Sequence, residues 1–212
     1  MGDPIAVDLF VEDRAHEEFI RPMINRLAHE EHTAVSVQVR SARGGHGRAT
    51  EELSLYQRAV KVGGVTAPDI LVVAIDGNCN RPAAARSGIE NQIDARFKAC
   101  TGIACPDPHI ERWYLADPES FAAVVGSRPK LGRKKCERGR YKAILSQAVA
   151  DAGHPATLGG IEFARELVQA MDLFRAGKTE RTLGDFVQEV RNVMRRLGRA
   201  VSRAGTRQSE ER

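Results

Sequence analysis

Two apolar runs, each followed at its end by a carboxylate, constrain this chain more than any other feature. Ile5 to Val11 is a short β-rich run that leads into Glu12, and Ile70 to Ile75 is a nearly all-apolar run that leads into Asp76. Because the carboxyl ends of parallel strands open onto one crevice, we expect these two acids to lie close together. Converging carboxylates repel unless a cation lies between them, and magnesium is the hard cation that binds a few carboxylates plus its own waters. The pattern therefore predicts a metal-dependent phosphoryl-transfer site.

The first half of the chain alternates strand-like and helical patterns. We therefore expect an α/β domain over residues 1–126 with a central, mostly parallel sheet. The run Ala34 to Val39 alternates apolar and polar residues, which predicts a strand near a sheet edge, whereas Asp69 to Ile75 predicts a central strand. The other expected elements are helices over Asp13–His29, Glu51–Val62, Arg86–Ala99 and Ile110–Val125, the last interrupted at Pro118, and a short strand over Cys100–Ala104.

The second half of the chain, residues 127–212, is expected to be a basic segment followed by helices that pack on the same unit. Three helical patterns cover Tyr141–Ala152, Ile161–Phe174 and Leu183–Leu197, and no strand pattern returns. The tail from Gly198 is rich in Arg, Ser and Glu, and we expect it to be frayed.

Three further polar residues are candidate metal ligands beside Glu12 and Asp76. Asn78 follows Asp76 and Gly77, so it offers a neutral oxygen where the backbone can approach a ligand closely. Glu111 and Asp117 follow the short strand ending at Ala104, and Glu111 is the stronger candidate because its helix would direct it toward the crevice. His109 is interpreted as a polar loop residue.

Each candidate also has a structural explanation. Glu12 could be a solvated acid in the first turn of a helix, and Asp76-Gly77-Asn78 could be a simple turn. Asp117 precedes Pro118 and could serve only to cap the next turn.

Basic residues are concentrated in the stretch from Ser127 to Lys142, which holds eight Lys or Arg residues and one acid. We expect this stretch to follow a nucleic-acid backbone, which would make binding weaken with salt; a solvated loop is the alternative. A second, glycine-rich stretch, residues 40–48, could contact substrate but lacks the spacing of a P-loop, so ATP binding is not indicated. The candidate nucleic-acid-binding residues are Arg43, Arg48, Arg128, Lys130, Arg133, Lys134, Lys135, Arg138 and Arg140.

The four cysteines lack the spacing of a structural zinc site, and we interpret them as reduced, mostly packed thiols. The N-terminus lacks a basic region followed by an apolar one, and no apolar run is long enough to span a bilayer. We therefore expect a cytoplasmic protein without a membrane-spanning segment.

The segments Leu9–Glu12 and Val72–Asn78 together resemble the Toprim domain, which uses a glutamate after its first strand and an Asp-x-Asp after a later one. That family includes topoisomerases, primases, OLD-type nucleases and small ribosomal-RNA maturases. Glu111–Asp117 is similar to a Glu-x-Trp-x-x-x-Asp segment of small stand-alone Toprim-like proteins. Two positions depart from the family pattern: Asp13 stands in place of a glycine, and Asn78 in place of the second aspartate.

The resemblance implies a nuclease that depends on Mg²⁺ or Mn²⁺ and acts on DNA or RNA. Glu12 would serve as ligand or base, Asp76 as the shared ligand, and Glu111 would complete the shell. It also implies a phage-defence setting with an ATPase partner. The alternative is a non-catalytic subunit of the same fold that binds nucleic acid or a partner protein, with Asn78 marking lost catalysis. The sequence leaves the oligomeric state open.

Overall fold

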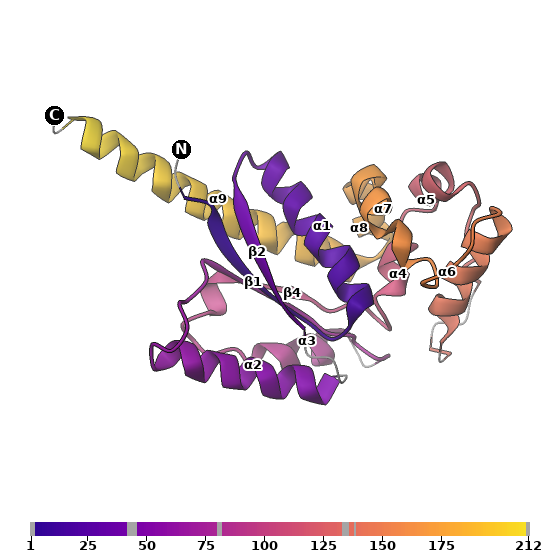
Figure 1. Ribbon diagram of the computed structural model, residues 1–212, viewed down its shortest axis with the longest axis horizontal. Coiled ribbons are helices and arrows are strands. Elements are labelled where there is room, and N and C mark those ends of the chain that lie inside the picture. Colours follow the sequence, from indigo (N-terminus) through magenta and orange to yellow (C-terminus); the bar gives the residue numbers. More distant parts are fainter. Residues whose placement is uncertain (1–2, 42–45, 80–81, 133–135, 138, 211–212) are drawn as a thin grey trace.

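The computed structural model describes residues 3–41, 46–79, 82–132, 136–137 and 139–210 (Figure 1). Strands and helices alternate as far as β4, and only helices follow it in this part of the chain. The strands are β1 (Ile5–Val11), β2 (Val35–Ser41), β3 (Ile70–Ala74) and β4 (Thr101–Ala104). The α-helices are α1 (Arg14–Glu30), α2 (His46–Lys61), α3 (Pro82–Glu90), α4 (Glu111–Tyr114), α5 (Pro118–Val125), α6 (Arg140–Asp151), α7 (Ala164–Ala170), α8 (Leu173–Thr179) and α9 (Arg181–Glu210), and two short 3₁₀ turns cover Lys98–Cys100 and Ile161–Phe163.

Within the described residues the strands form one four-stranded sheet in the order β2-β1-β3-β4, and all neighbouring pairs are parallel. The predicted α/β class with a parallel sheet and C-terminal helices is therefore confirmed. The alternating run that suggested an edge strand is β2, which lies at one edge of the sheet. The fully apolar run is β3, which lies inside the sheet, and all five of its residues are buried. Apolar patterning alone was enough to place these two strands.

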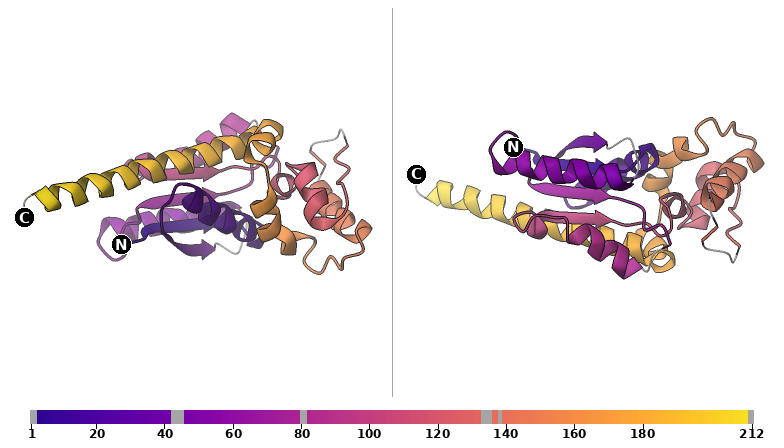
Figure 2. Two further views of the ribbon diagram at one scale, coloured as in Figure 1. Left: turned by 90° about the horizontal axis from the view of Figure 1, so that it is seen from above. Right: turned by 90° about the horizontal axis from the view of Figure 1, so that it is seen from below.

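The two faces of the sheet build two separate cores. On β3, Val72 packs with α1 and the C-terminal helices, whereas the adjacent Val73 packs with α2 and residues around α3. Successive side chains of a strand point to opposite faces, so an apolar strand must be covered on both sides. Figures 1 and 2 show α1 and α9 on one face and α2 and α3 on the other.

The helices α4 to α8 lie beyond the carboxyl ends of the strands, and α9 then returns along β4 and α1 (Figure 2). Close approach of α9 to β4 requires a glycine at position 102, because a Cβ there would lie 2.8 Å from Cγ2 of Val190. The C-terminal helices thus share one core with the sheet. This arrangement places a helical wall next to the edge where Glu12 and Asp76 emerge.

Several boundaries differ from the sequence prediction. Helix α3 ends at Glu90 rather than continuing to Ala99, because the Gln57 side chain binds the Gln92 carbonyl oxygen and the Asp94 amide. The predicted helix Ile161–Phe174 is divided into a 3₁₀ turn, α7 and the start of α8. Helix α9 continues to Glu210, where the sequence predicted a frayed tail; the residues beyond Gly198 are mostly compatible with a helix.

No helix in the described part of the chain is both long and apolar enough to cross a membrane.

Candidate metal centre at the carboxyl edge of the sheet

Glu12 and Asp76 meet where β1 and β3 end. The amide of Glu12 still bonds to the Ala74 carbonyl at 3.1 Å, and the amide of Asp76 donates to Oε2 of Glu12 at 3.1 Å. These two bonds fix the chain immediately after each strand. The structure therefore brings together the two acids that the sequence singled out first.

His16, in the first turn of α1, is the third member of this group. Its side chain is fully buried, and one ligand atom from each of Glu12, His16 and Asp76 lies within 4.8 Å of the others. Nδ1 of His16 lies 2.8 Å from Oδ1 of Asp13, and Nε2 lies 3.1 Å from Oδ1 of Asp76. The Nε2 contact is close enough for an ion pair but is not aligned as a hydrogen bond, and Nε2 has no other hydrogen-bond partner among the described residues.

The charges around His16 determine its pKa. Burial by itself would lower the pKa of an imidazole, but the contacts with Asp13 and Asp76 outweigh it and raise the pKa of His16 to about 10. Burial likewise opposes ionisation of Asp76, while His109 and His16 hold the pKa of that carboxyl below its usual value. These shifts favour a charged Asp76 carboxylate beside a cationic His16 imidazole.

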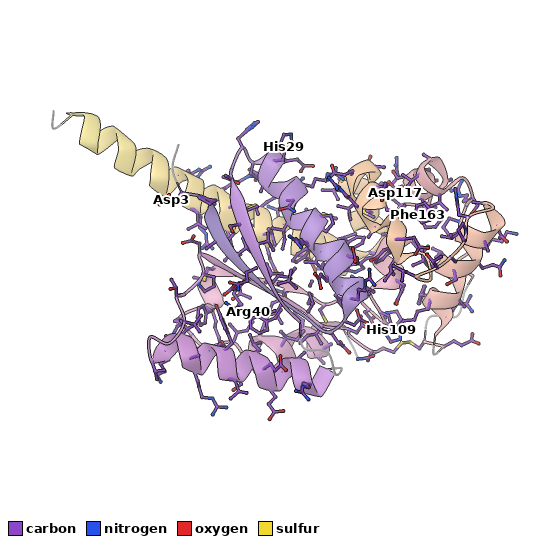
Figure 3. All side chains as sticks on the ribbon, viewed as in Figure 1. Asp3, His29, Arg40, His109, Asp117 and Phe163 are labelled. Carbon is purple, nitrogen blue, oxygen red and sulfur yellow. A yellow bond between two sulfur atoms is a disulfide. The ribbon has the colours of Figure 1, made fainter. Side chains whose placement is uncertain are left out.

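Asp76 is held by groups from the loop after β4. Its Oδ1 accepts the amide of Ile110 at 2.9 Å, and its Oδ2 lies 2.9 Å from Nδ1 of His109. Figure 3 places His109 close to the start of α1. The sequence interpretation of His109 as a polar loop residue did not include this contact with Asp76.

The loops after β3 and β4 are joined by backbone bonds. The amides of Gly77 and Asn78 donate to the carbonyls of Pro106 and Pro108 at 2.7 and 3.0 Å. A Cβ at position 77 would lie 3.2 Å from the Pro106 carbonyl oxygen, so glycine permits this close approach. Asn78 has a positive φ of 50°, and its side-chain amide donates to the Asp76 carbonyl rather than joining the carboxylates. The side-chain amide of Asn78 therefore stabilises the loop after β3.

Glu111 lies beside the group but not in it. The side chain is buried, its Oε1 lies 3.5 Å from Nζ of Lys142, and its Oε2 has no hydrogen-bond partner among the described residues. Burial raises the pKa of Glu111, although Lys142 opposes the shift. Glu111 and Lys142 line a pocket of about 240 Å³ together with Asp13, Arg14 and Ser146.

Asp117 is directed elsewhere, into the C-terminal helical part (Figure 3). Its carboxylate accepts hydrogen bonds from Nε and Nη2 of Arg175 at 2.8 and 2.9 Å, from Oγ of Ser120 at 2.6 Å and from the Asp172 amide at 2.9 Å. Of the five ligands expected from the sequence, Glu12 and Asp76 lie in the cluster, Glu111 lies next to it, and Asn78 and Asp117 have other contacts.

The described basic candidates are exposed or partly exposed. Arg48 pairs with Glu52, Arg128 pairs with Glu119, Lys130 is exposed, and Arg140 donates to the Leu131 carbonyl. The candidates that lie outside the described residues are Arg43, Arg133, Lys134, Lys135 and Arg138.

A disulfide between Cys79 and Cys136 corrects the prediction that all four cysteines are reduced. Both residues are exposed, whereas Cys100 and Cys105 are free thiols at partly buried and buried positions. The sequence offered no reason to pair two cysteines 57 residues apart, because only the fold brings their loops together. The bond ties the basic segment to the loop that begins at Asp76.

His16 was the functional candidate that sequence reasoning missed. A single histidine inside an apolar helical pattern is usually interpreted as a residue packed in the core. The available signal was its spacing, since His16 lies one turn after Glu12 and three residues after the helix cap Asp13.

Comparisons of the chain with protein-family models, curated proteins and solved structures found no match.

Proposed function

We propose that this chain is a Toprim-like phosphodiesterase that uses a divalent metal ion to hydrolyse DNA or RNA. One observation carries the proposal: the ligand atoms of Glu12, His16 and Asp76 lie within 4.8 Å of one another at the carboxyl edge of a parallel sheet. Nε2 of His16 is buried and makes no aligned hydrogen bond with the described residues, and its ion-pair contact with Asp76 would suit a bound cation that displaces the Nε2 proton. The resemblance to the Toprim pattern implies Mg²⁺ or Mn²⁺ as the ion.

Glu12, His16 and Asp76 would hold the metal, which when bound supplies activation of water and balances negative charge on the phosphate. Three protein ligands leave positions free for oxygen atoms of water or substrate. The contacts of Asp76 with Ile110 and His109 keep its carboxylate in place, so little reorganisation is needed when substrate arrives.

Glu111 and Lys142 would act on the substrate beside the metal. Because burial raises its pKa, Glu111 retains a proton at higher pH than an ordinary glutamate and can donate it to a leaving oxygen. Lys142 and Arg14 line the same pocket and offer positive charge to a phosphate. The basic segment from Ser127 to Lys142 would extend this contact along the nucleic-acid backbone.

The Cys79–Cys136 bond supports the same arrangement, because it keeps part of the basic segment next to the Asp76 loop. An ATPase partner, which the resemblance implies, and a cytoplasmic location are also part of the proposal.

A cleavage assay on plasmid DNA and on total tRNA tests the proposal. Glu12→Gln and Asp76→Asn should each abolish metal-dependent cleavage while circular dichroism stays unchanged. Asp69→Asn is the matched control. Asp69 lies just before β3, at the end of the strand opposite to Asp76, and it accepts a hydrogen bond from the Ala6 amide that the side-chain oxygen of asparagine can also accept. Cleavage retained in both site variants would refute the proposal.

A non-catalytic nucleic-acid-binding subunit is the second candidate. It is favoured by Asn78, which stands in place of a second aspartate and donates to a backbone carbonyl. Wild-type protein that binds nucleic acid but cleaves neither DNA nor RNA with any divalent metal would support this candidate.

A further inference from the structure

The donor set at the edge of the sheet contains a nitrogen atom, which a magnesium site does not need. We infer that Glu12, His16 and Asp76 form a centre for a first-row transition metal that binds imidazole, such as Zn²⁺, Fe²⁺ or Co²⁺, in preference to Mg²⁺. The inference rests on the metal site of the proposed function, but it does not require that the protein cleave nucleic acid.

The chemistry of the donors separates these ions. Mg²⁺ requires near-octahedral oxygen coordination and keeps several waters, whereas imidazole suits zinc, iron and related ions. Here one of three possible ligands is the imidazole of His16, and it is the only fully buried one of the three. A site with two carboxylates and one imidazole should therefore have high affinity for these transition metals and low affinity for Mg²⁺.

Asp13 holds the imidazole in the orientation that metal binding requires. Its Oδ1 lies 2.8 Å from Nδ1 of His16 and also accepts the His16 amide at 3.1 Å as the cap of α1. Without metal both ring nitrogens carry a proton, and metal binding would displace the one on Nε2. The proton on Nδ1 stays donated to Asp13, which gives the carboxylate–histidine pair that orients many metal-binding histidines. This gives a role to Asp13, the residue that stands where the Toprim pattern has glycine.

The surroundings of Nε2 indicate that the structure accommodates a ligand there. The atom is buried, lies 3.1 Å from Oδ1 of Asp76, and forms no aligned hydrogen bond with the described residues. His109 differs, since its Nδ1 makes an aligned contact with Asp76 and a quarter of its side chain is exposed. His16 is therefore the histidine positioned as a ligand, and His109 positions Asp76.

Cobalt binding tests the inference on metal-stripped protein. Wild-type protein should bind one Co²⁺ with a visible absorption spectrum, Zn²⁺ should displace it, and Mg²⁺ in large excess should not. His16→Gln should abolish the spectrum. Asp13→Ser keeps a good helix cap but lacks the carboxylate, and we expect Co²⁺ affinity to fall about 10–100-fold. His29→Gln, an exposed position at the far end of the same helix (Figure 3), should bind like wild type.

Several results would overturn the inference. These are displacement of Co²⁺ by Mg²⁺, wild-type affinity in both His16→Gln and Asp13→Ser, a thiolate-to-cobalt charge-transfer band indicating Cys100 or Cys105, or no binding of any ion. Asp13→Ser remains informative if His16→Gln does not fold.

The inference and the proposed function can fail separately. Cobalt and zinc binding of the expected kind without cleavage of nucleic acid would leave this inference intact and refute the nuclease. Cleavage that requires Mg²⁺ and survives His16→Gln would refute this inference and leave the nuclease intact.

Discussion

Replacing Asp117 by alanine should destabilise the protein without affecting metal binding. The Asp117 side chain is fully buried and joins the start of α5 to α8 through Arg175, Ser120 and the Asp172 amide. Breaking a buried ion pair costs about 3–5 kcal/mol. Because 46% of the Arg175 side chain is exposed and regains hydration when the pair breaks, we expect the lower cost of about 2–3 kcal/mol.

The pH dependence gives a second, independent check. Burial alone would raise the pKa of Asp117, but the bonds from Arg175, Ser120 and the Asp172 amide hold it well below its usual value of 3.8. A carboxyl whose pKa is lower in the folded state stabilises that state above its unfolded pKa. The difference in unfolding free energy between wild type and Asp117→Ala should therefore be constant above about pH 5 and shrink as the pH falls below about 4.

Urea denaturation at several pH values measures both effects, and a thermal melt should show the variant about 4–10 °C lower. Asp185→Ala is a suitable control, because that carboxylate is exposed and its nearest cation lies 3.8 Å away; its effect should stay within about 0.5 kcal/mol. A loss below about 0.5 kcal/mol for Asp117→Ala would refute this reasoning. A folded variant of normal stability that no longer binds metal would return Asp117 to the set of ligands.

Three other changes should have measurable effects. Cys136→Ser removes a cross-link between residues 57 apart and should lower the unfolding free energy by about 4 kcal/mol; reductant should lower the wild type to the same value and leave the variant unchanged. Gly102→Ala should cost about 1–3 kcal/mol because its Cβ would press on Val190, whereas Gly88→Ala, which meets open space within α3, should stabilise by about 0.5–1 kcal/mol; equal urea midpoints for the two variants would contradict the packing described. Lys142→Gln should weaken binding of duplex DNA and reduce the slope of log affinity against log salt by about 1, and an unchanged slope would remove Lys142 from the interface.

The sheet could be predicted from sequence because apolar patterning reports directly on burial. The alternation in β2 indicated one covered face, and the unbroken apolar run in β3 indicated two. The meeting of Glu12 and Asp76 followed from strand direction alone, since parallel strands deliver their carboxyl ends to one edge.

Contacts that depend on tertiary packing could not be predicted in the same way. Asp117 was a candidate ligand because it follows the strand that ends at Ala104, but its partner Arg175 lies on a helix that only the fold brings near. The same applies to Cys79 and Cys136. His16 was missed for a different reason, since buried histidine and buried apolar residues occupy the same helical positions.

An anomalous difference map from crystals soaked in Co²⁺ tests the central claim most directly. The account predicts one strong peak between Glu12, His16 and Asp76, with Nε2 of His16 as a ligand. A peak at another group of residues, or an undisturbed contact between Nε2 of His16 and Asp76 without metal, would contradict it.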